Sequence, residues 1–129
     1  MKTKEDVEKL EKLIGQLNRM YAELSVLAKK SPNDGINLFK MNLINKVLRS
    51  ANEFLVGDYL PFDDFDQFSQ DSLPTNSDVT LILSQYMEQV ERFRSDHVLL
   101  HAHKFRYVVN GEPGDVEARP PTRIGARRE

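Results

Sequence analysis

The amino-acid sequence predicts an all-α fold: a three-helix antiparallel bundle with a long aromatic and acidic connector and a small C-terminal β-hairpin. Apolar residues recur at spacings of three and four in three long segments, which is the period of an α-helix. Residues 57–76 interrupt this period, and alternation replaces it after residue 103. The length of 129 residues suits one domain. We expect a bundle over 1–103, a hairpin over 104–119 in the same domain, and a flexible basic tail over 120–129.

The first helix is predicted over about residues 4–30. Thr3 and Asp6 have the spacing of a capping box, in which a hydroxyl and a carboxylate satisfy free N–H groups at the helix start. The apolar stripe is broader than a two-position seam, so this helix should contact more than one neighbour. Pro32 and Gly35 then end the helix and turn the chain. Because this turn is short, a second helix should run back antiparallel to the first.

The second and third helices are predicted over about residues 36–56 and 77–100. Gly57 is well placed just beyond the end of the second helix. Thr75 or Ser77 can cap the third helix. Both segments have wide apolar stripes, so a bundle of three helices would expose leftover apolar surface unless the connector or a second subunit covered it.

The C-terminal segment changes to the period of a β-strand. Residues 104–109 alternate, and Asn110–Gly111 and Pro113–Gly114 are turn signals. These features predict the hairpin. Two strands alone are marginally stable, so the hairpin should lean on the helices or on another chain.

Composition and charge exclude several classes of protein. The absence of cysteine excludes disulfides, thiolate catalysis and cysteine-ligated metal. The N-terminus is charged where a signal peptide is apolar, and no apolar run approaches the ~20 residues of a membrane span, so we expect a cytoplasmic protein. Residues 1–56 hold ten basic and seven acidic residues, a net of +3, whereas residues 57–96 hold two and nine, a net of −7. Such asymmetry can orient a partner or a second copy of the chain.

The connector supports two interpretations. Its aromatic residues can fold onto the open face of the bundle as a lid, because large aromatic side chains usually supply core area. Alternatively, they form the centre of a recognition surface whose acidic rim prefers a basic protein partner. The predicted partner-binding residues are Tyr59, Phe62, Asp63, Asp64, Phe65, Asp66 and Phe68.

Metal binding and catalysis have little support in the sequence. His97 and His101 would share a helix face if the third helix continued, but no third ligand is evident. The aspartates of the connector do not match a calcium loop. There is no G-x-S-x-G, no S-x-x-K and no phosphate-binding glycine loop. We therefore expect no cofactor, no metal and no catalytic residue.

Nucleic-acid binding is the alternative function. The basic residues that would contact phosphates are Lys104, Arg106, Arg119, Arg123, Arg127 and Arg128. The sequence pI of about 5.9 and the acidic middle of the chain argue against it. The sequence therefore predicts first a non-catalytic protein–protein interaction or regulatory module, with another protein or a second copy of the chain as its partner.

Overall fold

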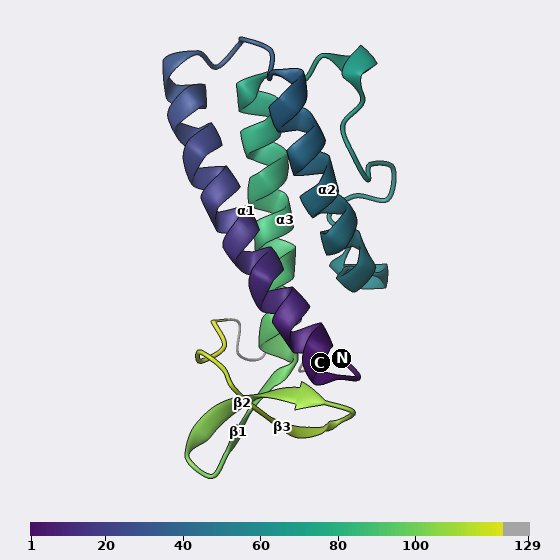
Figure 1. Ribbon diagram of the computed structural model, residues 1–129, viewed down its shortest axis with the longest axis vertical. Coiled ribbons are helices and arrows are strands. Elements are labelled where there is room, and N and C mark those ends of the chain that lie inside the picture. Colours follow the sequence, from purple (N-terminus) through teal and green to yellow (C-terminus); the bar gives the residue numbers. More distant parts are fainter. Residues whose placement is uncertain (123–129) are drawn as a thin grey trace.

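The computed structural model describes residues 1–122 and places three helices over a small antiparallel sheet (Figure 1). The helices are α1 (Lys4–Lys30), α2 (Leu38–Phe54) and α3 (Asn76–Asp96). Two short 3-10 turns, η1 (Gly57–Tyr59) and η2 (Gln70–Ser72), lie in the connector. The strands β1 (Val98–His101), β2 (Lys104–Val109) and β3 (Glu112–Glu117) form one sheet in the order β1-β2-β3.

The prediction of an all-α fold is wrong, because a three-stranded sheet follows the helices. The predicted third helix ends at Asp96 rather than at residue 100, and the next residues form β1. β1 pairs antiparallel with β2, so that Leu100 lies opposite Phe105. The turn between them, Ala102–His103, has positive φ at both residues, 52° and 69°. Two-residue hairpin turns of this kind usually contain Asn or Gly, so Ala102 and His103 carry no turn signal.

The hairpin of β2 and β3 confirms the turn predicted at Asn110–Gly111, where φ is 53° and 79°. The second turn signal, Pro113–Gly114, is wrong, because both residues lie inside β3. The β2–β3 register shifts there. A Cβ atom at Gly114 would lie 3.0 Å from the carbonyl oxygen of Tyr107. Glycine therefore permits the close approach of the two backbones at this irregularity.

The direction of α3 also differs from the predicted antiparallel bundle. Figure 1 shows that α2 and α3 run parallel to each other and that both run antiparallel to α1. Gly35, before α2, forms an isolated β-bridge with Thr75, before α3, so the two helices start at the same end. The connector, residues 55–75, returns the chain to that end. The 17 residues of α2 rise about 25 Å, a distance that the connector spans easily.

The helix starts follow local capping chemistry. Thr3 with Asp6 and Thr75 with Asp78 form complete capping boxes, as expected for α1 and α3. Asn37 caps α2, which is shorter at both ends than the predicted range of 36–56. These caps satisfy N–H groups that the first turn of each helix leaves free.

A single hydrophobic core runs through the bundle and down to the sheet. α1 and α3 pack along each other extensively, whereas α2 makes fewer contacts with either. Tyr107 of β2 is buried and its hydroxyl donates to Glu11 of α1. The hairpin therefore rests on the helices, and α1 contacts two helices and the sheet.

Candidate functional site

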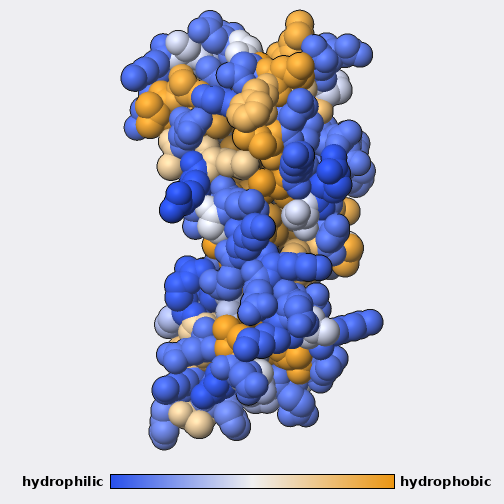
Figure 2. All heavy atoms as spheres, in the orientation of Figure 1, coloured by the Kyte–Doolittle hydropathy of each residue, from blue (hydrophilic) through white to orange (hydrophobic). Residues whose placement is uncertain are grey.

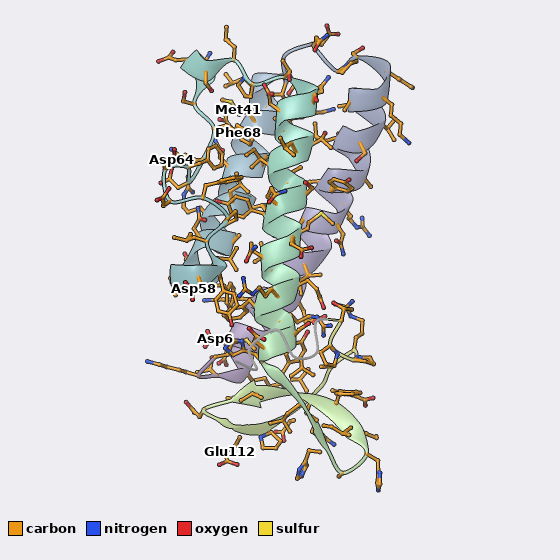
Figure 3. All side chains as sticks on the ribbon, turned by 180° about the vertical axis from the view of Figure 1, so that it is seen from behind. Asp6, Met41, Asp58, Asp64, Phe68 and Glu112 are labelled. Atoms are coloured by element: carbon orange, nitrogen blue, oxygen red, sulfur yellow. The ribbon has the colours of Figure 1, made fainter. Side chains whose placement is uncertain are left out.

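The connector is fastened to α2 through its last aromatic residue. Phe68 is only 6% exposed and belongs to the core. The side chain of Asn45 accepts a hydrogen bond from the Phe68 N–H and donates one to the Phe68 carbonyl, each at 2.9 Å. Asn52 donates to the carbonyl of Asp66 at 3.0 Å. Figure 3 shows Phe68 turned in toward α2 and Asp64 on the outer bend of the connector. These side-chain amides fix the connector as a part of the fold.

The aromatic residues of the connector form a chain that leads from the surface into the core. The ring centroids of Phe62 and Phe65 are 6.4 Å apart, and those of Phe65 and Phe68 are 5.1 Å apart, both with edge-to-face geometry. Tyr59 packs on α3, and its hydroxyl donates to Asp96. Three of the four aromatic residues predicted to bind a partner, Tyr59, Phe65 and Phe68, thus pack on or into the core.

The carboxylates of the predicted recognition surface remain at the surface. Asp63, Asp64 and Asp66 are exposed, and Phe62 beside them is half-buried. Tyr59, Phe65 and Phe68 therefore act as a lid on the bundle, in agreement with the first interpretation of the connector. Partner binding through Phe62 and these aspartates stays a prediction.

The basic residues of the alternative site do not form an isolated basic patch in the described part of the chain. Lys104 pairs with Glu117 at 3.8 Å. The guanidinium of Arg106 donates to two carbonyl groups of β3 at 3.4 and 3.5 Å. Arg119 is exposed just after β3. Arg123, Arg127 and Arg128 lie outside the described residues.

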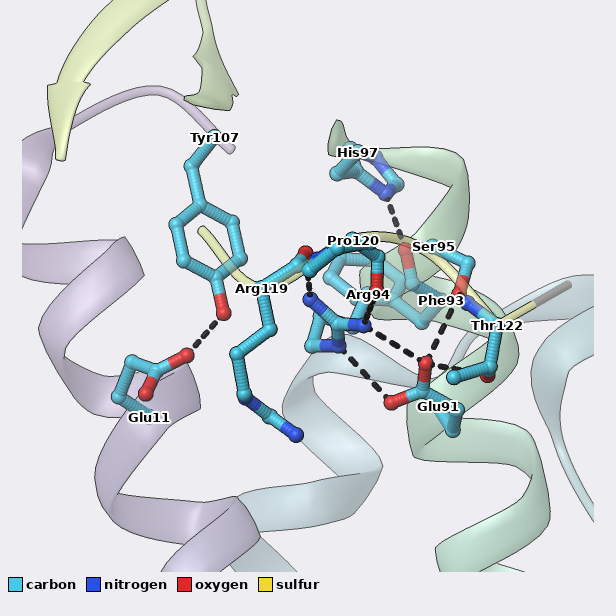
Figure 4. A network of polar contacts seen from close by, with 10 residues as sticks. All are labelled: Glu11, Glu91, Phe93, Arg94, Ser95, His97, Tyr107, Arg119, Pro120 and Thr122. Atoms are coloured by element: carbon cyan, nitrogen blue, oxygen red, sulfur yellow. Dashed lines mark hydrogen bonds and ion pairs between the residues drawn. The ribbon is translucent and has the colours of Figure 1, made fainter. Parts of the chain in front are cut away.

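A buried ion pair joins the end of α3 to the chain that follows the sheet (Figure 4). Arg94 is fully buried, and its guanidinium donates twice to the carboxylate of Glu91, each time at 2.8 Å. The same guanidinium donates to the carbonyls of Arg119 and Pro120, both at 2.9 Å. The first residues of the predicted flexible tail are therefore held against α3, which corrects that prediction for residues 120–122.

The other oxygen contacts of Glu91 complete this network. Glu91 accepts hydrogen bonds from Ser95 at 2.9 Å and from Thr122 at 2.6 Å. Burial alone would raise the pKa of Glu91. The hydrogen bonds from Arg94, Thr122 and Ser95 and the positive charge of Arg94 outweigh this effect and lower the pKa to about 2. The carboxylate is thus ionised and satisfied on both oxygens, which fits a structural role. No motif or periodicity in the sequence marks this pair.

The histidines do not form the helical pair that the sequence allowed for. α3 ends before His97, and His101 lies in β1. The His97 ring stacks on Phe93 with centroids 4.1 Å apart, and its Nδ1 lies 2.7 Å from the Phe93 carbonyl oxygen. Among residues 1–122, no group of three or more His, Cys, Asp or Glu side chains could hold a metal ion.

A groove with an apolar floor lies between α1 and α2. Figure 1 shows that the connector follows the other side of α2 and that α3 lies behind both helices. Figure 2 shows apolar surface running along the gap, with hydrophilic side chains on both sides. We call this feature the α1–α2 groove; it consists of two hollows, lined by Leu13, Val47 and Phe54 and by Met20, Leu24, Leu43 and Ile44. Its floor is the top of the core, because Leu13, Leu24, Ile44 and Val47 are at most 4% exposed.

The edge of the groove on α2 presents large apolar side chains to solvent. Leu43 is 38% exposed, and Phe39, one turn before it, is 72% exposed. Phe39 and Leu43 also line an adjoining hollow on the outer face of α2. Phe39 in particular contributes little to the core, yet burying such a side chain is worth about 2 kcal/mol.

The rim of the groove is basic. Its charged side chains are Lys9, Lys12, Arg19, Glu23, Lys40, Lys46 and Glu53, five basic against two acidic, a net of +3. Lys40 of α2 and Glu23 of α1 form an ion pair of 2.9 Å between the two walls. An apolar floor within a basic rim can bind an apolar surface that has acidic neighbours.

The sequence predicts half of this feature. The wide stripes predicted leftover apolar surface, but the connector covers only one side of α2 and leaves the side toward α1 open. The signal for the open side was the row Lys40, Leu43, Val47, Ser50 and Phe54, which repeats at spacings of three and four and shares Val47 with the buried stripe.

A comparison with protein-family models, with curated proteins and with solved structures finds no match for this chain. Within residues 1–122, none of the helices combines the length and the apolar character that a membrane crossing requires.

Proposed function

We propose that this protein is a non-catalytic protein–protein interaction module and that the α1–α2 groove is its partner-binding surface. One observation supports the proposal above the others: the connector covers one side of α2, whereas the edge of the groove on α2 leaves Leu43 and the adjoining Phe39 exposed. Exposed apolar side chains with a polar rim are typical of interaction sites. The cytoplasmic location stays the sequence-based expectation.

The groove supports partner binding better than the connector does. In the connector, Phe65 and Phe68 already fill the core, and a partner could reach them only by opening the fold. In the groove Leu43 is accessible without any rearrangement, and so is Phe39 in the adjoining hollow. Exposed anchors beside a preformed hollow favour binding because little ordering is required.

Site-specific photo-cross-linking tests this proposal. A photoreactive side chain at Leu43 should capture a defined partner from a native extract, whereas the same group at Leu81 should not. Leu81 is a matched control because it is 61% exposed on α3 and lies outside the groove. In parallel, Leu43→Gln in a chain without the photoreactive group should abolish affinity co-purification of that partner, and Leu81→Gln should not. Equal capture from both positions, or from neither, would refute the groove as the binding surface.

The nucleic-acid alternative has no comparable observation in its favour. Lys104 and Arg106 are engaged with β3, and three of the other predicted arginines lie outside the described residues. It stays a prediction from the sequence.

A further inference from the structure

We infer that the α1–α2 groove receives a single amphipathic α-helix of another protein, with acidic residues on both flanks of its apolar stripe. This inference rests on the proposed function and names the class of its partner. It follows from the shape of the groove, from the charges on its rim and from the unsuitability of other occupants.

The shape of the groove fits a helix. Both of its walls are helices, and an incoming helix can lay the ridge of its apolar side chains between them. The lining of α2 extends from Lys40 to Phe54, which at about 1.5 Å per residue is roughly 21 Å. A helix of about 15 residues, or four turns, would fill this length and would complete a four-helix arrangement opposite α3.

The charges fit an acidic helix. Lys12 and Lys46 are exposed on opposite walls near one end of the groove, and Arg19 and Lys40 lie near the other end. Glutamates flanking the apolar stripe of a seated helix would come within reach of both walls. The Glu23 carboxylate now holds Lys40, so an incoming carboxylate would compete with Glu23 for this lysine.

A second copy of the chain fits less well. Two grooves placed face to face would set a net of +3 against a net of +3, and like charges across an interface oppose association. The acidic connector of a second copy is also unsuitable, because Phe65 and Phe68 are packed in its own core. A nucleic acid could pair with the rim, but its phosphate backbone would leave the apolar floor unfilled.

Peptide binding to the full chain tests the inference. Three fluorescent peptides of about 15 residues would share one leucine stripe at helical spacing, flanked by glutamate, by glutamine or by lysine. We expect the glutamate peptide to bind about tenfold more tightly than the glutamine peptide, since each of about three exposed ion pairs contributes about twofold. The lysine peptide should bind most weakly, and the differences should shrink in about 1 M salt. A glutamate peptide with a central proline should not bind, because it cannot form the helix.

Charge variants locate the effect in the groove. Lys12→Glu combined with Lys46→Glu should reverse the order of the glutamate and lysine peptides. Lys30→Glu combined with Lys104→Glu, which changes the net charge equally outside the groove, should keep the order. Glu23→Gln should tighten binding of the glutamate peptide a few-fold because it releases Lys40. Circular dichroism would verify that each variant keeps its helical content.

Several outcomes would overturn the inference. Equal affinity for all three peptides would exclude an acidic helix, as would stronger binding of a single-stranded oligonucleotide at the same rim. A stable dimer in sedimentation, disrupted by Leu43→Gln, would identify a second copy as the occupant. If no peptide binds but Leu43 still cross-links a partner, the helix inference fails and the proposed function stands. If cross-linking also fails, both fail.

Discussion

Replacing Glu91 with glutamine would leave the buried guanidinium of Arg94 without its counter-charge. Removing one member of a buried ion pair typically costs about 3–5 kcal/mol. Arg94 would keep the carbonyls of Arg119 and Pro120, and the Glu91 side chain is 27% exposed, so the loss should lie at or just below the low end of this range. We expect Glu91→Gln to lower the free energy of unfolding by about 2–3 kcal/mol at neutral pH.

The pH dependence of this loss gives an independent check. The pKa of Glu91 is about 2 in the folded chain against an ordinary value of 4.5. Because the folded-state pKa is the lower one, the contribution is complete above about pH 4.5 and disappears as the pH falls toward about 2. At about 1.4 kcal/mol per pH unit the full contribution is about 3 kcal/mol, which we discount to about 2 because solvent screens the partly exposed carboxylate.

Urea unfolding followed by far-ultraviolet circular dichroism would measure both effects. The difference between wild type and Glu91→Gln should be largest at pH 7 and should fall to less than half at about pH 3. Glu23→Gln is the matched control, because it removes an exposed ion pair with Lys40 and should cost at most about 1 kcal/mol. A difference that stays constant between these pH values, or an equal loss in the control, would refute the structural role given to Glu91.

Three further predictions concern local contacts. Ala102→Asn combined with His103→Gly should stabilise the protein by about 1 kcal/mol and raise the melting temperature by about 4 °C, because both residues have positive φ in a hairpin turn. A lower melting temperature would contradict the turn geometry. Asn45→Ala should cost about 1–2 kcal/mol in urea unfolding, because two backbone groups of Phe68 lose their partner, whereas Asn42→Ala on the exposed face should cost almost nothing. Thr75→Ala should lower the free energy of unfolding by about 1 kcal/mol in urea, and Thr75→Ser, which keeps the capping hydroxyl, should retain the wild-type value. Equal stability of Thr75→Ala and wild type would contradict a stabilising role of the capping box.

The features that the sequence predicted well depend on neighbouring residues. The starts of α1 and α3 follow from Thr3, Asp6 and Thr75, whose side chains act within one helical turn. The Asn110–Gly111 turn is equally local. Such contacts are encoded within about four residues, so the sequence alone identifies them.

The features that the sequence did not predict depend on distant residues. β1 forms because Leu100 and its neighbours find a partner in β2, and the pairing overrides a helical period that continues to residue 100. The starts of α2 and α3 meet at the bridge between Gly35 and Thr75, 40 positions apart. The contact of Arg94 with Arg119 spans 25 positions. No periodicity specifies which residues will meet across such separations.

The candidate site shows the same difference between features encoded by neighbouring residues and features that depend on distant residues. The aromatic and acidic composition of the connector drew attention to residues 57–76, but composition does not distinguish a lid from a recognition surface. The Asn45 contacts with Phe68 make that distinction, and they join α2 to a segment 23 positions away. The groove required knowledge of which side of α2 the connector covers.

The sparse packing of α2 has a consequence for how the molecule opens. α1, α3 and the sheet share the largest contacts and the Arg94 network, whereas α2 is held chiefly by its inner stripe and by the connector. α2 and the connector can therefore detach together as one cooperative unit while the rest of the fold stays intact. Native-state hydrogen exchange should show amide protons of α2 exchanging through a sub-global opening, at a lower free energy than those of α1 and α3. Seating a helix against α2 would close that opening, so a bound partner would slow exchange along the whole of α2 and the connector, well beyond the residues it touches.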